Sequence, residues 1–376
     1  MPKNRIFNKI VICGYGVIGK LLSELLIDLD FEVLVIDAID HKDTDVKFET
    51  ANCADIEAIR KIVKKYKSEA LISCLPYNFN RHLASLCFEE KLHYFDPTED
   101  VVTTNHVREL AHKADTLFIP QNGLAPGIIN IIANGLIKKF DRKTIRSSRL
   151  RVGALPQNPV GEFGYACNWS PEGLVNEYIK PSIIIEDYKQ KEVRSMGRKE
   201  TIFVGGVEYE AFLTSGGVAT LCDHYEDDIQ NLNYKSIRYP GHLHCLNIVI
   251  DQLKLRDDQD KIVGLFRNAL LPDDHDHVII HVSIEGEVSG QKMTKEFVAD
   301  YYPQKLCGKY RTAISWTTAL SIATNVDLAA RNTFGAKGFV AQENIPIQEY
   351  FNSKTGNYFI EFHNNNNIFE ELLNEQ

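Results

Sequence analysis

Apolar and polar positions alternate along the first third of the chain in a strand-and-helix rhythm. Residues 9–13 form a short apolar run, a glycine-rich turn follows at 14–19, and residues 21–29 carry leucines at helical spacing. A second apolar run, 31–36, ends at Asp37. The same reading predicts further strands near 46–49, 70–75, 93–95 and 116–120, with helices between them and Asp55 as a helix cap. This alternation predicts a Rossmann-type doubly wound parallel sheet of the α/β class.

The turn after the first strand has the spacing of a dinucleotide-binding fingerprint, G-x-G-x-x-G. Gly14 allows the tight turn, Gly16 lets the backbone approach a pyrophosphate, and Gly19 lets the helix pack on the strand. Asp37 lies 18 residues after Gly19, near the position of the carboxylate that binds a ribose 2′-OH. A carboxylate there repels a 2′-phosphate, so the cofactor we expect is NAD rather than NADP.

Sheets of this type bind ligands at the carboxyl ends of their strands. The segments expected there are 14–19, 75–77, 96–100 and 121–127. The two glycines of 123–127 suit backbone contact with the nicotinamide half, or they simply turn the chain. The full set of expected cofactor contacts is Gly14, Tyr15, Gly16, Val17, Ile18, Gly19, Asp37, Cys53, Leu75, Pro76, Thr98, Gly123, Leu124, Ala125, Pro126 and Gly127.

Beyond Thr144 the rhythm changes, because strand-like runs appear without regular helices between them. These runs are 148–153, 201–204, 277–284 and 296–302, and helices are expected at 171–178, 243–253 and 313–330. The pattern predicts a second α+β domain on a mixed or antiparallel sheet. We expect a nucleotide-binding domain at 1–128, completed by helices at about 310–350, and a substrate and dimerisation domain at 129–309. A C-terminal tail is expected at 351–376, and its last residues, with Asn364 to Asn367, are polar and expected to fray.

Composition narrows the class of protein. A net charge of −9 and a pI near 5.8 disfavour nucleic-acid and anionic-membrane partners. No run of 18 apolar residues predicts a membrane span, and the start Met1-Pro2-Lys3 leaves no room for a secretory signal. The eight cysteines are scattered singly, so we expect reduced thiols, no metal site and a cytoplasmic location.

Candidate substrate-binding chemistry lies in both halves of the chain. Asp96, at a strand end, is expected to face the cleft. Thr214 and Ser215 lie in a small-residue loop, and Lys235 and Arg238 could bind carboxylates, although charge pattern alone favours a solvated strand edge. His242 and His244 could form a metal pair, but a surface location is favoured. Trp169 could pack on a ligand or lie in the core.

Several motifs together resemble the saccharopine dehydrogenase family, from about Ile10 to about Asn344. They are YFDPTEDV (94–101), GLAPG (123–127), RVGALP (151–156), WSPEGL (169–174), EAFLTSGG (210–217) and YKSIRYPGH (234–242). The likeness is greatest to bacterial stand-alone, glutamate-forming enzymes of lysine degradation, with L-lysine 6-dehydrogenase as a close relative.

The resemblance implies NAD-dependent oxidation of the secondary amine of saccharopine to an imine, whose hydrolysis releases L-glutamate and 2-aminoadipate 6-semialdehyde. It also implies a homodimer. Ala125 replaces an acid of the related fungal enzymes, and Asp96 is a candidate replacement. The base is left open among Asp96, Glu99, Lys235 and His242. The residues expected to be catalytic are Asp96, Lys235 and His242. The expected substrate contacts are Tyr77, Asp96, Thr98, Trp169, Thr214, Ser215, Lys235 and Arg238.

Two other functions stay open at this point. L-lysine 6-dehydrogenase, which deaminates the ε-amine of lysine with NAD, has a segment similar to 234–242. A non-catalytic NAD-binding protein would keep the fingerprint glycines but could lose the motifs of the second half, which are all present here.

Overall fold

The computed structural model describes residues 5–41, 46–363 and 367–374. The chain forms two compact units. Unit 1 comprises Met1–Ile128, Cys307–Lys309 and Ser315–Phe359, and unit 2 comprises Ile129–Leu306, Tyr310–Ile314 and Ile360–Gln376. The start Met1-Pro2-Lys3 and the asparagines 364–366 lie outside the described residues.

Unit 1 is built on a sheet of seven strands in the order β17-β6-β5-β4-β1-β2-β3, and every neighbouring pair is parallel. The strands are β1 (Lys9–Cys13), β2 (Glu32–Asp37), β3 (Lys47–Thr50), β4 (Ala70–Ser73), β5 (His93–Phe95), β6 (Leu117–Ile119) and β17 (Gly338–Phe339). Apolar runs such as 10–13 are buried on both faces, as strands covered by helices require.

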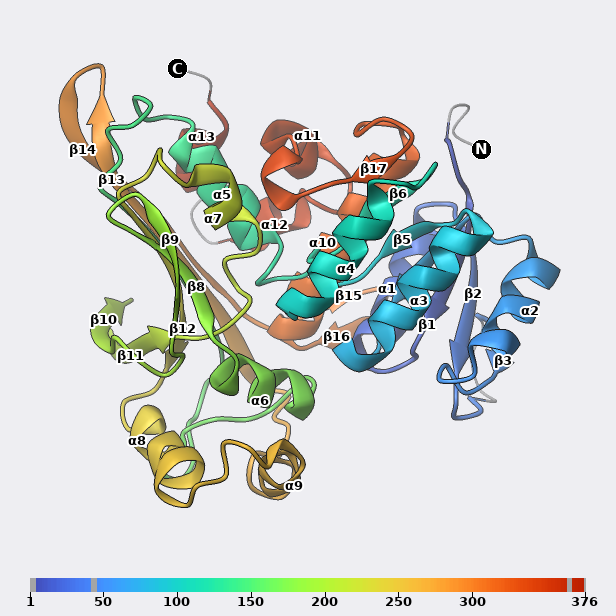
Figure 1. The fold of residues 1–376 in the computed structure, drawn as a ribbon, viewed down its shortest axis with the longest axis horizontal. Helices are drawn as coiled ribbons and strands as arrows, with labels where there is room; N and C mark the ends of the chain where they lie inside the picture. The colour runs from blue at the N-terminus through green and yellow to red at the C-terminus, as the bar shows by residue number, and fades with distance from the viewer. Residues whose placement is uncertain (1–4, 42–45, 364–366, 375–376) are drawn as a thin grey trace. The chain divides into compact units, whose positions relative to one another are not determined.

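The helices of unit 1 follow the strands in alternation. They are α1 (Val17–Asp28), α2 (Ile56–Tyr66), α3 (Tyr77–Glu90), α4 (Val101–Ala111), most of α10 (Ala313–Ala330), the 3₁₀ turn Gln342–Asn344, α11 (Ile347–Asn352) and the first half of α12 (Tyr358–Glu361). Figure 1 shows α3 and α4 side by side. The short strand β17 returns from the C-terminal third of the chain to pair with β6.

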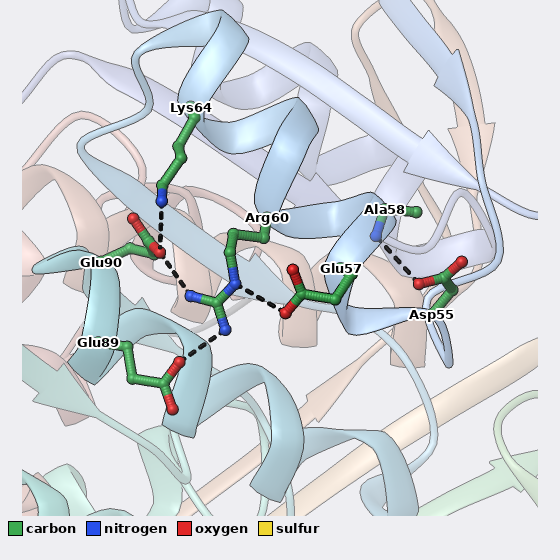
Figure 2. A network of polar contacts seen from close by, with 7 residues as sticks. All are labelled: Asp55, Glu57, Ala58, Arg60, Lys64, Glu89 and Glu90. Carbon is green, nitrogen blue, oxygen red and sulfur yellow. Dashed lines mark hydrogen bonds and ion pairs between the residues drawn. The ribbon is translucent and has the colours of Figure 1, made fainter.

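Local side chains set the helix ends. Asp55 caps α2 by accepting the Ala58 N–H at 3.0 Å, which confirms the predicted cap. Figure 2 shows how Arg60 on α2 then binds Glu57, Glu89 and Glu90, so that α2 is joined to the end of α3. Helix α4 begins at Val101, because Asp100 accepts the Thr103 N–H at 2.8 Å and caps its first turn.

Unit 2 is built on a mixed sheet of eight strands with the path β10-β11-β12-β7-β13-β14, to which β8 and β9 add beside β12. The pairing of β12 with β7 is parallel, and the others are antiparallel. Its strands are β7 (Ser147–Pro156), β8 (Ser182–Glu186), β9 (Lys189–Val193), β10 (Glu200–Val204), β11 (Val207–Leu213), β12 (Asn231–Arg238), β13 (Asp276–Val288) and β14 (Gln291–Tyr301); a separate pair is β15 (Gln304–Leu306) and β16 (Lys309–Arg311). The predicted fold class is confirmed.

The helices of unit 2 are α5 (Ile128–Ile137), α6 (Pro171–Ile179), α7 (Leu221–Tyr225), α8 (His242–Leu246), which continues as a π-helix over Asn247–Gln252, α9 (Gln259–Ala269) and α13 (Asn367–Leu373). Figure 1 shows α6, α8 and α9 gathered at one end of the sheet. Their apolar side chains share one buried cluster with strand residues such as Phe212 and Ile237.

The expectation of a frayed tail is wrong for residues 367–373. They form α13, in which Phe369 and Leu372 are buried. The Phe369 ring lies 5.2 Å from the ring of Phe297 on β14. In the sequence, the asparagines before this helix suggest a polar tail, although two apolar side chains follow at helical spacing. Burial of these two side chains stabilises the helix more than fraying at the chain end destabilises it.

Candidate functional site

The glycine turn after β1 has the geometry that its spacing predicts. Gly14 has a φ of +102°, and a Cβ atom on it would lie 2.9 Å from the Cys74 carbonyl oxygen. A Cβ on Gly19 would lie 2.0 Å from the Gly14 carbonyl oxygen, so α1 can pack on the turn only with glycine there. A Cβ on Gly16 would meet no atom within 4 Å. The exposed backbone at Gly16, at the N-terminus of α1, is therefore open to a phosphate group.

Asp37 stands at the carboxyl end of β2 and folds over this turn. Its carboxylate accepts the Tyr15 N–H at 2.6 Å and the Ile39 N–H at 3.0 Å. Each carboxylate oxygen keeps a further lone pair, which could accept a ribose hydroxyl. Two independent observations therefore agree with dinucleotide binding at this turn. The backbone at Gly16 is open, and the Asp37 carboxylate is held in a fixed orientation beside it.

Asp96 lies directly after β5 and is fully buried. Its Oδ1 accepts the Thr98 N–H at 2.8 Å, whereas its Oδ2 has no hydrogen-bond partner among the described residues. Burial raises the pKa of the Asp96 carboxyl from 3.8 to about 6, although the Thr98 N–H lowers it. A buried carboxyl at a strand end, with one idle oxygen and a pKa near neutrality, can take up a proton from a ligand.

Other buried polar groups at the same sheet edge were not predicted from the sequence. The Asn122 N–H donates to the Asp96 carbonyl at 3.1 Å, and neither side-chain atom of Asn122 has a partner among the described residues. Gln342 donates to the Pro120 carbonyl at 3.0 Å from a segment more than 200 residues away. Asn122 was within the expected segment 121–127, and an amide just after a buried strand was the available signal.

The segment 123–127 closes on itself. The Gly123 N–H donates to the Pro126 carbonyl at 3.0 Å, and a Cβ on Gly127 would lie 1.8 Å from the Gly123 carbonyl oxygen. A Cβ on Gly123 would lie 3.0 Å from the Pro97 Cβ, so close packing within and around this segment gives a structural reason for both glycines. Leu124 and Pro126 are buried, and Ala125 is half-buried.

The remaining predicted contacts in unit 1 lie around the same strand ends. Leu75, Pro76 and Tyr77 are half-buried at the start of α3, and Thr98 is buried. Val17 is exposed and Ile18 half-buried in the first turn of α1. Cys53 is buried in the apolar cluster that also contains Cys13. The geometry leaves these cofactor contacts as predictions.

In unit 2, Arg238 ends β12 and is buried, with only 3% of its surface exposed. Its Nε donates to the Tyr178 hydroxyl at 2.9 Å, and one Nη donates to the Ile237 carbonyl at 2.8 Å. Glu177 Oε2 lies 3.9 Å from the other Nη, which is longer than a hydrogen bond. The guanidinium carbon lies 4.6 Å from the centre of the Tyr165 ring. This buried cation thus has Nη donors without an acceptor among the described residues.

Lys235 is on the opposite face of β12. Its ammonium binds Glu200 at 2.8 Å and the Arg198 carbonyl at 2.6 Å, and Arg151 binds the same Glu200. Residues three apart in a strand point to opposite faces, so Lys235 and Arg238 cannot hold the same carboxylate. The favoured reading of a solvated edge is also wrong, because both side chains are buried and β12 lies between β11 and β7.

His242 is fully buried, so the expected surface location is wrong for it; His244, two residues on, is exposed. The two cannot share a metal, and the described residues contain no cluster of three potential metal ligands. The Thr214 hydroxyl pairs with Ser236 at 2.8 Å, and the Ser215 hydroxyl donates to the Pro181 carbonyl at 2.7 Å. Trp169 is half-buried and donates from Nε1 to the Tyr165 hydroxyl at 3.0 Å.

Comparison with known proteins decides the family. The model of the saccharopine dehydrogenase NADP binding domain matches residues 10–118, and that of the saccharopine dehydrogenase C-terminal domain matches residues 123–356. The chain belongs to the saccharopine dehydrogenase family. It is therefore an oxidoreductase with a nicotinamide-nucleotide-binding domain, as the glycine turn predicted.

Several solved structures match over nearly the whole chain. Apo saccharopine dehydrogenase (L-Glu forming) from Saccharomyces cerevisiae matches with a TM-score of 0.71 and 15% identity, covering 92% of this chain and 97% of the yeast chain. An engineered D-amino acid dehydrogenase bound to NADP⁺ matches with a TM-score of 0.46 and 12% identity, covering 91% and 95%. A probable dehydrogenase from Thermotoga maritima gives 0.44 and 10%, covering 92% and 96%.

Saccharopine dehydrogenase family membership and the yeast structure agree on the fold. Both family models together cover the two units, and the parallel sheet carries the nucleotide-binding match. Among the described residues, no helix is long and apolar enough to cross a membrane.

Proposed function

We propose that this chain oxidises the secondary amine of saccharopine with NAD and forms L-glutamate and 2-aminoadipate 6-semialdehyde, as a homodimeric cytoplasmic enzyme of lysine degradation. Bound NAD would accept hydride from the carbon on the lysine side of the bridging nitrogen. Water then adds to the substrate imine, and cleavage of the C–N bond releases glutamate and the aldehyde. One water is consumed and one proton is released for each hydride transferred.

The environment of Arg238 is the observation that supports a substrate with carboxylate groups. One Nη of this buried guanidinium donates to the Ile237 carbonyl, and the other has no carboxylate closer than 3.9 Å among the described residues, so an anionic ligand would complete its hydrogen bonds. Arginine's planar fork matches a carboxylate bidentately. Saccharopine carries three carboxylates, and we assign one of them to Arg238.

Asp96 is the base in this proposal. Its pKa of about 6 leaves the carboxyl largely ionised at pH 7, yet basic enough to take a proton from the amine or from the attacking water. The idle Oδ2 is the atom that would receive it. Lys235 is less suited to this role because its ammonium is bound to Glu200.

Asp37 supports NAD as the cofactor. Its carboxylate is held by two backbone N–H groups beside the glycine turn, where it would accept the ribose 2′-OH and repel a 2′-phosphate. The residues that would hold the dinucleotide are Gly14, Gly16 and Gly19, through the backbone, and Asp37.

L-lysine 6-dehydrogenase is the second candidate, and one observation favours it. Because Lys235 is bound to Glu200 on the other face of β12, unit 2 offers Arg238 without Lys235 to the carboxylates of saccharopine. Lysine has a single carboxylate and would need no second cation. Initial rates of NADH formation with saccharopine and with lysine separate the two functions, since glutamate is released from the first and ammonia from the second.

A further inference from the structure

We propose that Tyr178 and His242 are positioning residues, which act through one hydrogen-bond chain to aim the guanidinium of Arg238 at a substrate carboxylate. The proposal rests on the proposed function for the role of Arg238. It gives His242 a role different from that of a catalytic base, because none of the hydrogen-bonded groups has to gain or lose a proton.

The chain of hydrogen bonds links three buried side chains to a fixed backbone oxygen. Arg238 Nε donates to the Tyr178 hydroxyl at 2.9 Å. The Tyr178 hydroxyl lies 3.1 Å from His242 Nε2, and His242 Nδ1 lies 2.7 Å from the Phe163 carbonyl oxygen. The three residues come from β12, α6 and the first position of α8, so the chain joins three elements of unit 2.

The direction of every hydrogen bond in this chain follows from its two ends. A carbonyl oxygen can only accept, so His242 Nδ1 carries the proton and donates to Phe163. Arginine can only donate, so the Tyr178 oxygen accepts from Arg238 and its own proton goes to His242 Nε2. Burial and the nearby Arg238 charge lower the pKa of His242 to about 3, which keeps Nε2 unprotonated. A single tautomer of neutral His242 therefore satisfies the whole chain.

Aromatic rings hold the same groups in place. The His242 ring lies 5.3 Å from the Tyr165 ring and 5.6 Å from the Phe163 ring, both edge-on, and 6.4 Å from Phe212, stacked. The guanidinium lies over the Tyr165 ring at 4.6 Å, and Trp169 Nε1 donates to the Tyr165 hydroxyl at 3.0 Å. Nε is bound to Tyr178, one Nη donates to the Ile237 carbonyl, and the flat face is covered. The other Nη, with Glu177 no closer than 3.9 Å, is the donor that we assign to a ligand.

Loss of this chain of hydrogen bonds should weaken substrate binding and leave the rate of the chemical step unchanged. Without an acceptor at Tyr178, the buried Nε loses its partner and the guanidinium loses its fixed orientation, although it keeps its charge. Neither Tyr178 nor His242 touches the reacting atoms in the proposed mechanism. The expected signature is a raised KM for the substrate with an almost unchanged kcat.

Two substitutions of one residue separate this role from simple packing. In His242→Gln the side-chain oxygen can replace Nε2 and still accept from Tyr178, whereas in His242→Asn the shorter amide keeps the bond to Phe163 and cannot reach Tyr178. We expect His242→Asn and Tyr178→Phe to raise KM for saccharopine about tenfold, with kcat within about twofold of the wild type, and His242→Gln to stay within about threefold in both. His244→Asn, on the exposed side of α8, is the matched control and should change neither constant.

Steady-state rates on the full chain and histidine ¹⁵N NMR of the ligand-free protein complete the test. The proposal is supported by the KM split and by a neutral His242 protonated on Nδ1 between pH 5.5 and 8. It is overturned if His242→Asn and His242→Gln are equally impaired, or if neither His242→Asn nor Tyr178→Phe changes KM. A fall of about 100-fold in kcat of these variants at constant KM, as for a lost general base, would also overturn it. So would a proton on Nε2 of His242.

Failure of the proposed function gives a different result. If the wild type oxidises lysine and not saccharopine, the same variants are compared with lysine, whose carboxylate still requires Arg238. If neither substrate is oxidised, or if His242→Asn does not fold, the NMR tautomer of the wild type decides the matter. The Nδ1–H tautomer then upholds the chain, and any other protonation of His242 overturns it.

Discussion

Replacement of Asp96 by asparagine should make the protein more stable and almost inactive. The Asp96 carboxyl is fully buried, and its pKa is raised from 3.8 to about 6 by that burial. The folded state therefore favours the protonated form, so the stability it contributes is fully present below pH 3.8 and is lost as the pH rises through 6. The difference between the two pKa values corresponds to about 3 kcal/mol at pH 8. An asparagine, which is never charged, avoids this loss and can keep the acceptor for Thr98.

Denaturant unfolding of wild type and Asp96→Asn between pH 4 and pH 8 measures the effect. The stability of the variant relative to the wild type should grow by about 2.5 kcal/mol across this range, since a small part of the effect is already present at pH 4. Asp115→Asn is the control in the same unit, because that carboxylate is exposed and should show no such gain. Equal pH dependence of wild type and Asp96→Asn would contradict the burial argument.

The same variant should lose about 10² to 10⁴ in kcat, the usual contribution of a general base. The wild-type rate is expected to rise from neutral to alkaline pH, because the substrate amine must be deprotonated before hydride leaves, and to fall below pH 6 as Asp96 is protonated. Normal kcat and KM in Asp96→Asn would remove Asp96 from the mechanism, and a flat profile from mildly acidic to alkaline pH would refute the amine requirement.

Three further predictions concern the cofactor turn and the C-terminal helix. Gly16→Ala should keep the wild-type melting temperature but raise the dinucleotide Kd in calorimetry. Gly19→Ala should lose both stability and binding, because its Cβ would lie 2.0 Å from a carbonyl oxygen. Equal melting temperatures and equal Kd values for the two variants would contradict the turn geometry. Asp37→Asn should lower the ratio of kcat/KM for NAD over NADP about tenfold or more, since the repelling charge is gone; an unchanged ratio would refute that role. Phe369→Ala should cost about 3 kcal/mol in urea unfolding, and no loss would mean that α13 frays.

The nucleotide-binding half could be predicted closely from the sequence because its signals are local. Strands buried on both faces read as continuous apolar runs, and β1 and β5 have their expected bounds. Glycines at fixed spacing and the cap at Asp55 act within a few residues of themselves. For such features, neighbouring residues in the sequence are also the neighbours in space.

The chemistry of β12 could not be predicted because its partners are distant in the sequence. Charged residues in a short strand suggested an exposed edge, yet Lys235 is matched by Glu200 and Arg238 by Tyr178, which are 35 and 60 residues away. Burial of His242 likewise depends on aromatic rings from other segments. A pattern of charge along the chain does not reveal a counter-charge or ring that only the fold brings near.

The measurement that tests the central claim most directly is a parallel assay of purified full-length protein with NAD. Initial rates of NADH formation are compared with saccharopine and with lysine, for the wild type and for Arg238→Lys, which keeps the charge and removes the planar fork. The account predicts turnover of saccharopine alone, with release of glutamate, and a KM for saccharopine at least about tenfold higher in Arg238→Lys. Turnover of lysine with release of ammonia, or an unchanged KM in the variant, would contradict it.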